Sequence, residues 1–188
     1  MSDILISLIL LTPVTITAIV QMVIVKKNLF SSLAKPIDGR KEILGNYILG
    51  ETKTWRGVIF MLICTPIVSV AFYPLFPMFC NISCSPLLNF QFGILTGLGY
   101  SLGEFPNSFI KRRCSIPSGE VPETVFWRSI VVFADSFDSS FGATILVLLS
   151  GLFIGGVNII IYAFIIGGVI HISVNFILWE MNVKKYWT

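Results

Sequence analysis

The chain has 188 residues, of which 55% are hydrophobic and 12% are charged, and its formal net charge at pH 7 is +3. This composition is far from that of a soluble domain of the same length. We therefore predict an all-α, polytopic membrane protein that forms a single domain over residues 1–188. We expect no nucleic-acid partner, because the basic residues lie in loops beside apolar spans.

Runs of about twenty apolar residues predict about five transmembrane helices. In chain order these runs cover residues 4–25, 57–79, 86–103, 125–149 and 152–179. The first run has no cationic segment before it and no small-residue cleavage site. We therefore interpret it as a retained helix rather than a signal peptide.

The cations are unevenly divided among the connections between these spans. The first connection carries Lys26, Lys27, Lys35, Arg40, Lys41, Lys53 and Arg56, and the third carries Lys111, Arg112, Arg113 and Arg128. The other two connections carry neither Lys nor Arg. Cytoplasmic loops are enriched in these residues, so we predict that the N-terminus is outside and the C-terminus is cytoplasmic. Within the first connection we expect a short interfacial helix near residues 42–48.

The four cysteines are scattered, and only Cys80 and Cys84 lie close together in the sequence. A zinc site has little support, because no His and no second cysteine pair is nearby. A local disulfide and two free thiols both remain open.

The third span contains glycines at positions 93, 97, 99 and 103, a spacing that allows another helix to approach closely. These glycine-rich faces would permit a homodimer without requiring one. Gly103 has a second interpretation, because it directly precedes Glu104 and could leave room for a ligand beside that carboxylate.

Beyond this span, Ser108 and Lys111 follow Glu104 by four and seven residues. The three side chains share one face if the helix continues past Pro106. The consecutive cations at 111–113 either anchor the helix end at the cytoplasmic surface or bind a polyphosphate. Arg offers a bidentate fork for phosphate, and Lys offers a compact charge.

Two acids lie in the fourth apolar run, where an ionised carboxylate is costly unless it has a partner. Asp135 and Asp138 are three residues apart and therefore lie on one helical face. They could share a Mg²⁺ ion that also binds substrate phosphates, since oxygen ligands suit this ion. The alternative is a salt bridge to Arg128 or Lys111.

In the last span, His171 and Asn175 are four residues apart and lie on one face. They either form a hydrogen-bonded packing pair or contact a phosphate or base of a substrate. The chain has no glycine-rich phosphate loop of the P-loop type and no Gly-x-Ser-x-Gly elbow. Nothing therefore supports P-loop hydrolysis or serine acyl transfer.

Six short segments occur in an order that resembles the CDP-archaeol synthase family, a membrane-embedded branch of the phosphatidate cytidylyltransferase group. They are Lys-Pro-Ile-Asp-Gly at 35–39, Lys-Thr-Trp-Arg-Gly at 53–57, Gly-x-Gly-x3-Gly-Glu-x3-Ser-Phe-Ile-Lys-Arg-Arg at 97–113, Pro-x-Gly-Glu at 117–120, Asp-x2-Asp at 135–138 and His-x3-Asn at 171–175. Each segment is short, and their ordered combination carries the resemblance.

This resemblance implies a multi-pass enzyme of the cell membrane that acts in phospholipid biosynthesis with Mg²⁺ as cofactor. The implied partners are CTP, a lipid phosphate in the bilayer and the surrounding membrane lipids. The implied acceptor is of the archaetidic-acid type, 2,3-bis-O-geranylgeranyl-glycerol 1-phosphate. Cytidylyl transfer to it would give a CDP-archaeol-type lipid and pyrophosphate.

The resemblance also implies roles for individual residues. Metal-binding acids would be Glu104, which stands where the family usually has Asp, together with Asp135 and Asp138. The catalytic group would comprise Lys111, Asp135 and Asp138. Substrate binding would involve Lys53, Arg56, Ser108, Arg112 and Arg113, and we add His171 and Asn175 to this group.

Two alternatives to this enzyme follow from the same residues. The first is a small cation- or proton-coupled transporter, which would need polar residues that continue to the outer side of the membrane. The outer halves of the last two spans offer little beyond Asn158. The second is an inactive homologue, because the Glu104 carboxylate is displaced by one methylene relative to Asp.

Overall fold

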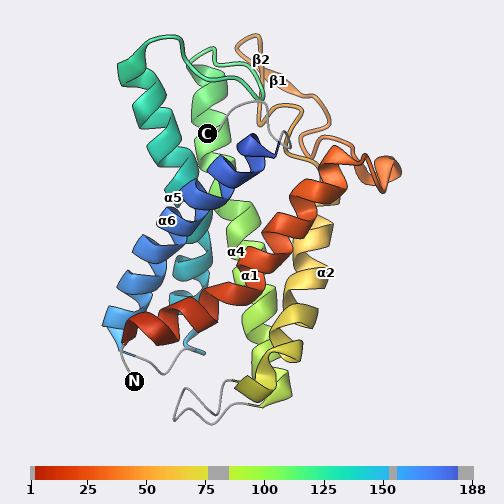
Figure 1. Cartoon of the computed structure of the whole chain (residues 1–188). Helices are drawn as coiled ribbons and strands as arrows, with labels where there is room; N and C mark the ends of the chain where they lie inside the picture. Colours follow the sequence, from red (N-terminus) through yellow and green to blue (C-terminus); the bar gives the residue numbers. More distant parts are fainter. Residues whose placement is uncertain (1–2, 76–84, 153–155, 182–188) are drawn as a thin grey trace.

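The computed structural model describes residues 3–75, 85–152 and 156–181, and most of them lie in long helices (Figure 1). These helices are α1 (Asp3–Lys26), α2 (Trp55–Ala71), α4 (Pro86–Arg113), α5 (Val125–Ser150) and α6 (Val157–Glu180). Short 3-10 turns lie at η1 (Ser31–Leu33) and η2 (Tyr73–Leu75). The all-α prediction is confirmed.

Within the described residues, three helices are long and apolar enough to cross a membrane: α1, α5 and α6. The second predicted span is shorter than expected, because α2 has 17 residues and ends at Ala71. Its predicted residues 76–79 lie outside the described part of the chain. The third predicted span is longer than expected, because α4 continues past residue 103 to Arg113. The last helix begins at Val157 rather than at 152.

Helix α4 is packed between α2 and α5, and its glycines allow both contacts. A Cβ atom at Gly97 would lie 2.6 Å from the backbone oxygen of Met61 in α2. One at Gly99 would lie 2.7 Å from Cα of Ala143 in α5. Side chains larger than hydrogen therefore do not fit at these positions, and the predicted helix packing is confirmed.

Gly103 also packs against α5. A Cβ atom there would lie 3.0 Å from Cα of Gly142, and the backbone oxygen of Asp138 is closer still. The interpretation of Gly103 as space for a ligand is therefore wrong, because the backbone of α5 fills that space.

Helix α1 crosses the bundle obliquely and packs against α2 and α6 (Figure 1). A small apolar core forms along it from Leu11, Val14, Met61 and Ala163. Near the start of α1, the hydroxyl of Ser7 donates a hydrogen bond of 2.9 Å to the backbone oxygen of Ile159 in α6. This bond joins the first and last helices at one end of the molecule.

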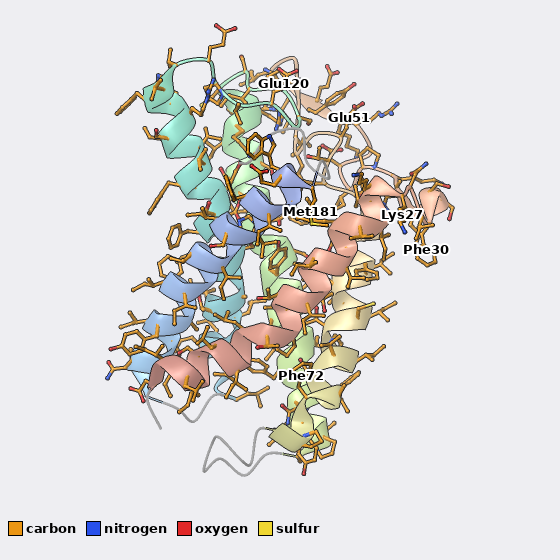
Figure 2. The ribbon with its side chains drawn as sticks, viewed as in Figure 1. Lys27, Phe30, Glu51, Phe72, Glu120 and Met181 are labelled. Carbon is orange, nitrogen blue, oxygen red and sulfur yellow. The ribbon has the colours of Figure 1, made fainter. Side chains whose placement is uncertain are left out.

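The two cation-rich connections lie at the same end of the bundle. Glu51 and Glu120, one in each connection, are close to that end, as are Lys27 and Met181, whereas Phe72 lies at the opposite end (Figure 2). Both connections can therefore lie on the same side of the membrane, as the distribution of cations predicts. The orientation with the N-terminus outside stays a prediction.

The predicted interfacial helix near residues 42–48 is wrong, because the chain forms a hairpin there. Strand β1 (Glu42–Ile43) pairs antiparallel with β2 (Asn46–Tyr47). Leu44 and Gly45 between them have φ values of 53° and 75°. Two consecutive residues with positive φ form the tight turn typical of hairpins and are incompatible with a right-handed helix.

Two of the four cysteines lie in the described part of the chain. Cys64 and Cys114 are free thiols. Cys80 and Cys84 lie outside the described residues, so their predicted alternatives stay open.

Candidate active site

A polar cavity of about 440 Å³ lies beneath the two cation-rich connections. Its walls come from α1, α4, α5 and α6 and from the segments just before α2 and α5. Nine residues predicted for the site line this cavity: Lys53, Glu104, Ser108, Lys111, Arg112, Asp135, Asp138, His171 and Asn175. The segments that the sequence singled out separately therefore meet at one place.

Helix α4 supplies the largest share of this lining. It continues through Pro106 without interruption, so the expected shared face of Glu104, Ser108 and Lys111 is confirmed. Proline lacks an N–H and therefore leaves one backbone carbonyl of the preceding turn without its helical partner. Membrane helices tolerate this loss where neighbouring groups compensate for it.

Lys53 enters the cavity from the segment before α2 and forms an ion pair with Glu104. Two backbone hydrogen bonds hold this segment: Ile37 N–H donates to the oxygen of Lys53 at 2.9 Å, and Trp55 N–H donates to that of Lys35 at 3.0 Å. The motif at 35–39 therefore positions the motif at 53–57.

The surroundings of Lys53 favour its charged form. Burial by itself would lower the pKa of Lys53, but the negative charge of Glu104 and the hydrogen bond to it act in the opposite direction. The charges of Asp138 and Asp135 add to this effect, so the pKa of Lys53 is raised above its ordinary value. Lys53 is therefore a permanent cation of the cavity at physiological pH.

The carboxylates of α5 face α4. Lys111 Nζ lies 2.6 Å from Oδ1 of Asp135, which confirms one of the two salt bridges considered from the sequence. Arg128 instead donates to the backbone oxygens of Pro122 and Glu123, at 3.1 and 3.4 Å.

One side chain that the sequence analysis left out joins the two acids. Nδ2 of Asn107 lies 2.6 Å from Oδ1 of Asp135 and 2.7 Å from Oδ2 of Asp138. The backbone N–H of Ser139 also donates to Asp138. The two carboxylates therefore converge on a single nitrogen atom.

Helix α6 closes another wall of the cavity with His171 and Asn175. Nδ1 of His171 and Nδ2 of Asn175 are 3.4 Å apart, as their spacing of four residues predicts. The pair is thus both hydrogen-bonded and adjacent to the cavity, so the hydrogen-bonded pair is confirmed and contact with a substrate stays a prediction.

Two predicted arginines lie outside the cavity lining and donate hydrogen bonds to oxygens of the loops. Arg56 is buried and donates to Asn28 Oδ1 at 3.2 Å and to the Leu29 oxygen at 3.0 Å, which fixes the chain after α1. Arg113 donates to the oxygens of Ile43, Asn46 and Tyr47 and therefore holds the hairpin. The structure does not bring either side chain into the cavity lining.

The donor atoms of the cavity suit a divalent ion such as Mg²⁺. Asp135 and Asp138 offer oxygens that converge on Nδ2 of Asn107. Asp135 is also paired with Lys111, and Glu104 is paired with Lys53. Within the described residues, no three acidic, His or Cys side chains are close enough to enclose an ion. Mg²⁺ commonly takes one or two carboxylates and completes its shell with substrate phosphates and water. The α5 pair fits that pattern.

Three residues at or beside the cavity were missed from the sequence, although signals for them exist: Tyr100 and Gln21 line it, and Asn107 contacts the two acids of α5. Asn107 is three residues after Glu104 and four before Lys111, so helical spacing alone places it on their face. Tyr100 precedes Glu104 by four residues and lines the same cavity. Gln21 of α1 also lines it, and a polar side chain in an apolar span is itself a sign of function.

Comparison with known proteins gives a consistent result. A model of the family described as "CarS-like: CDP-archaeol synthase" matches residues 1–188. The chain is 28% identical to the CDP-archaeol synthase of Methanococcus aeolicus over 81% of its own length and 82% of that protein. It is 41% identical to that of Thermococcus gammatolerans over 45% of its own length and 48% of that protein. No solved structure matches the chain.

Proposed function

We propose a reaction for this chain from the premise that it belongs to the CDP-archaeol synthase family, as its ordered motifs predict. It is accordingly a membrane enzyme of the cytidylyltransferase class, and its family acts in archaeal lipid synthesis. We propose that the chain transfers the cytidylyl group of CTP to a lipid phosphate in the cell membrane. The proposed acceptor is the archaetidic-acid type diether of glycerol 1-phosphate, and the products are a CDP-archaeol-type lipid and pyrophosphate.

The observation that carries this proposal is the convergence of charge in one cavity. Lys53, Lys111 and Arg112 supply positive charge for phosphates, and Asp135 and Asp138 supply oxygens for a divalent ion. A cavity of about 440 Å³ is large enough for a nucleotide-sized ligand. It also lies beside the charged loops, where a water-soluble nucleotide can meet a lipid headgroup.

The reaction needs little covalent participation from the protein. A phosphate oxygen of the lipid attacks the α-phosphorus of CTP, and the bond from that phosphorus to the pyrophosphate oxygen breaks. The attacking phosphate is already anionic near neutral pH, so no strong general base is required. Catalysis then depends on holding the two phosphates in line and on stabilising their negative charge.

The residues of the cavity divide this work. Lys111 and Arg112, one turn beyond Ser108, bind phosphate oxygens and orient CTP. Lys53 approaches from the segment before α2, and the Glu104 carboxylate holds its ammonium group. Asp135 and Asp138 would hold a divalent ion, which supplies charge neutralisation for the pyrophosphate that leaves.

Apolar side chains border the polar cavity, as a second cavity of about 40 Å³ beside it shows. The second cavity is smaller and mostly apolar, is lined by residues of α1, α4, α5 and α6 such as Leu11, Val14 and Ala143, and shares Tyr100 and His171 with the polar cavity. Hydrocarbon next to the phosphate site is the environment that a lipid phosphate needs when its chains stay in the bilayer.

An assay with purified full-length protein, labelled CTP, Mg²⁺ and a panel of lipid phosphates tests the proposal. The panel pairs diether with diester acceptors and glycerol 1-phosphate with glycerol 3-phosphate backbones. We expect CDP-lipid and pyrophosphate in equal amounts, with the unsaturated diether of glycerol 1-phosphate preferred. Absence of product with every acceptor would mean an inactive homologue and would refute the proposal.

A further inference from the structure

Asn107 occupies the position between the two carboxylates of α5. Its Nδ2 reaches Oδ1 of Asp135 at 2.6 Å and Oδ2 of Asp138 at 2.7 Å, and the side chain extends from α4 to α5 to do so. Both distances are at the short end of the hydrogen-bond range. The amide thus stands where a cation shared by the two acids would stand.

The charged side chains around this position are unevenly paired. Glu104 is paired with Lys53, and Asp135 is paired with Lys111. Asp138 accepts hydrogen bonds from the amide of Asn107 and from the backbone N–H of Ser139, and both donors are neutral. A carboxylate next to a second carboxylate requires positive charge, of which an amide carries only a fraction.

An asparagine amide can change partners without moving the backbone. Its nitrogen only donates hydrogen bonds, and its oxygen accepts them and also binds hard cations. A half-turn about the terminal side-chain bond exchanges the two atoms. The group can therefore satisfy two carboxylates in one orientation and a metal ion in the other.

We propose that Asn107 is a positioning residue for the divalent ion. Without the ion, its amino group bridges Asp135 and Asp138 and keeps them at the separation an ion needs. With the ion bound, its Oδ1 turns inward and joins the carboxylates as a ligand. This inference rests on the proposed function only for the identity of the ion, since binding can be measured without nucleotide or lipid.

Calorimetric titration of MnCl₂ into the full-length protein in detergent tests the inference. Asn107→Leu keeps a side chain that branches at Cγ but removes both donor and acceptor. We expect it to weaken Mn²⁺ binding by about tenfold or more, the usual range for groups that orient metal ligands. The matched control is Asn89→Leu on the same helix, where the amide donates to the Ser85 oxygen at 3.2 Å, and wild-type affinity is expected there.

Asn107→Asp separates a ligand from a simple link between helices. A carboxylate at this position keeps an oxygen for the ion but adds negative charge beside the other two acids. We expect Mn²⁺ affinity at least equal to that of wild type, together with a lower thermal midpoint in EDTA that recovers when Mn²⁺ is added. A link between helices without contact to the ion would give equal thermal losses with and without Mn²⁺.

Two results would overturn the inference. One is an Asn107→Leu affinity within about twofold of wild type. The other is an Asn107→Asp protein that binds Mn²⁺ more weakly than wild type, and this arm decides the matter if the leucine variant does not fold. Failure of the wild-type protein to form CDP-lipid would instead refute the proposed function and leave these binding results in force.

Discussion

The two halves of α4 use the same helix in opposite ways. From Gly93 to Gly103 its four glycines let α2 and α5 approach until backbones touch. From Glu104 to Arg113 it carries a face of charged and polar side chains that lines the cavity. The first half therefore sets the distance between α4 and α5. At that distance the cations of the second half lie close to the carboxylates of α5.

The largest effect should come from the polar half and its partner on α5. We expect Asp135→Asn to lower kcat for CDP-lipid formation by about a hundredfold to a thousandfold or more, because charge stabilisation at the reacting phosphates is lost. Membrane insertion and thermal stability should change little, since the amide still accepts from Lys111. Glu123→Gln, an acid in the exposed loop before α5, is the control. Wild-type turnover by the asparagine variant would remove the metal role of Asp135.

A smaller loss of activity is expected when Lys53, the cation paired with Glu104, is replaced. Lys53→Met should lower kcat/KM for CTP by about tenfold to a hundredfold, the range for one charged hydrogen bond. Lys35→Met removes the same charge from the same connection, outside the cavity lining, and should be nearly silent. Equal effects of the two changes would indicate that CTP responds to the overall positive charge of the connection and not to a contact with Lys53.

The raised pKa of Lys53 fixes the direction of its pH dependence. A raised pKa in the folded state means that the pair with Glu104 stabilises the protein fully below the ordinary pKa of 10.5 and is lost only as the pH rises through the folded value. The kcat/KM profile between pH 6 and 9 should therefore contain no step that Lys53→Met removes. A step that disappears in this variant would contradict the assigned charge.

Substitutions in the glycine-rich first half of α4 are expected to affect stability more than the rate of the reaction. A Cβ atom at Gly99 would meet the backbone of Gly142 and Ala143, so Gly99→Ala should destabilise the protein by about 1–3 kcal/mol. Thermal unfolding in detergent measures this, with Gly156→Ala as the control because nothing lies within 4 Å of a Cβ there. A Gly99→Ala protein of wild-type stability that no longer binds the metal would instead mean that α5 moves relative to α4 while the two helices stay packed.

The smallest effect is expected at the last residue of α4. Arg113 holds the hairpin through the oxygens of Asn46 and Tyr47, at 2.9 and 2.6 Å. Arg113→Gln should make the hairpin more sensitive to proteolysis and leave kcat within about threefold of wild type, as for most changes outside a reacting centre. Arg112→Gln, one residue earlier and in the cavity lining, should raise KM for CTP. A larger loss of activity in Arg113→Gln than in Arg112→Gln would indicate that Arg113 does bind substrate.

Much of this site follows from helical spacing. Glu104, Ser108 and Lys111 share a face because they are four and three residues apart, and Asp135 and Asp138 because they are three apart. Such patterns are local, so the sequence alone contains them. The five helices follow in the same way from apolar runs, although their ends do not.

The features that were missed depend on contacts between distant segments. The role of Arg113 depends on the carbonyls of a hairpin about 70 residues earlier, and the hairpin itself depends on positive φ at Leu44, a residue with no preference for that conformation. Gly103 was interpreted as room for a ligand because the sequence does not reveal that Gly142 of α5 packs against it. Local patterns cannot contain such information.

The close approach of α4 and α5 gives the two carboxylates unequal freedom. The backbone of α5 touches Gly103 at the level of Asp138, so this acid sits where the helices are locked and serves as a fixed reference point. Asp135 lies about one helical turn further on, past the locked stretch, where the flexible side chain of Lys111 is its tether. For the proposed ion, a change of radius would therefore be absorbed by Asp135, while Asp138 stays in place.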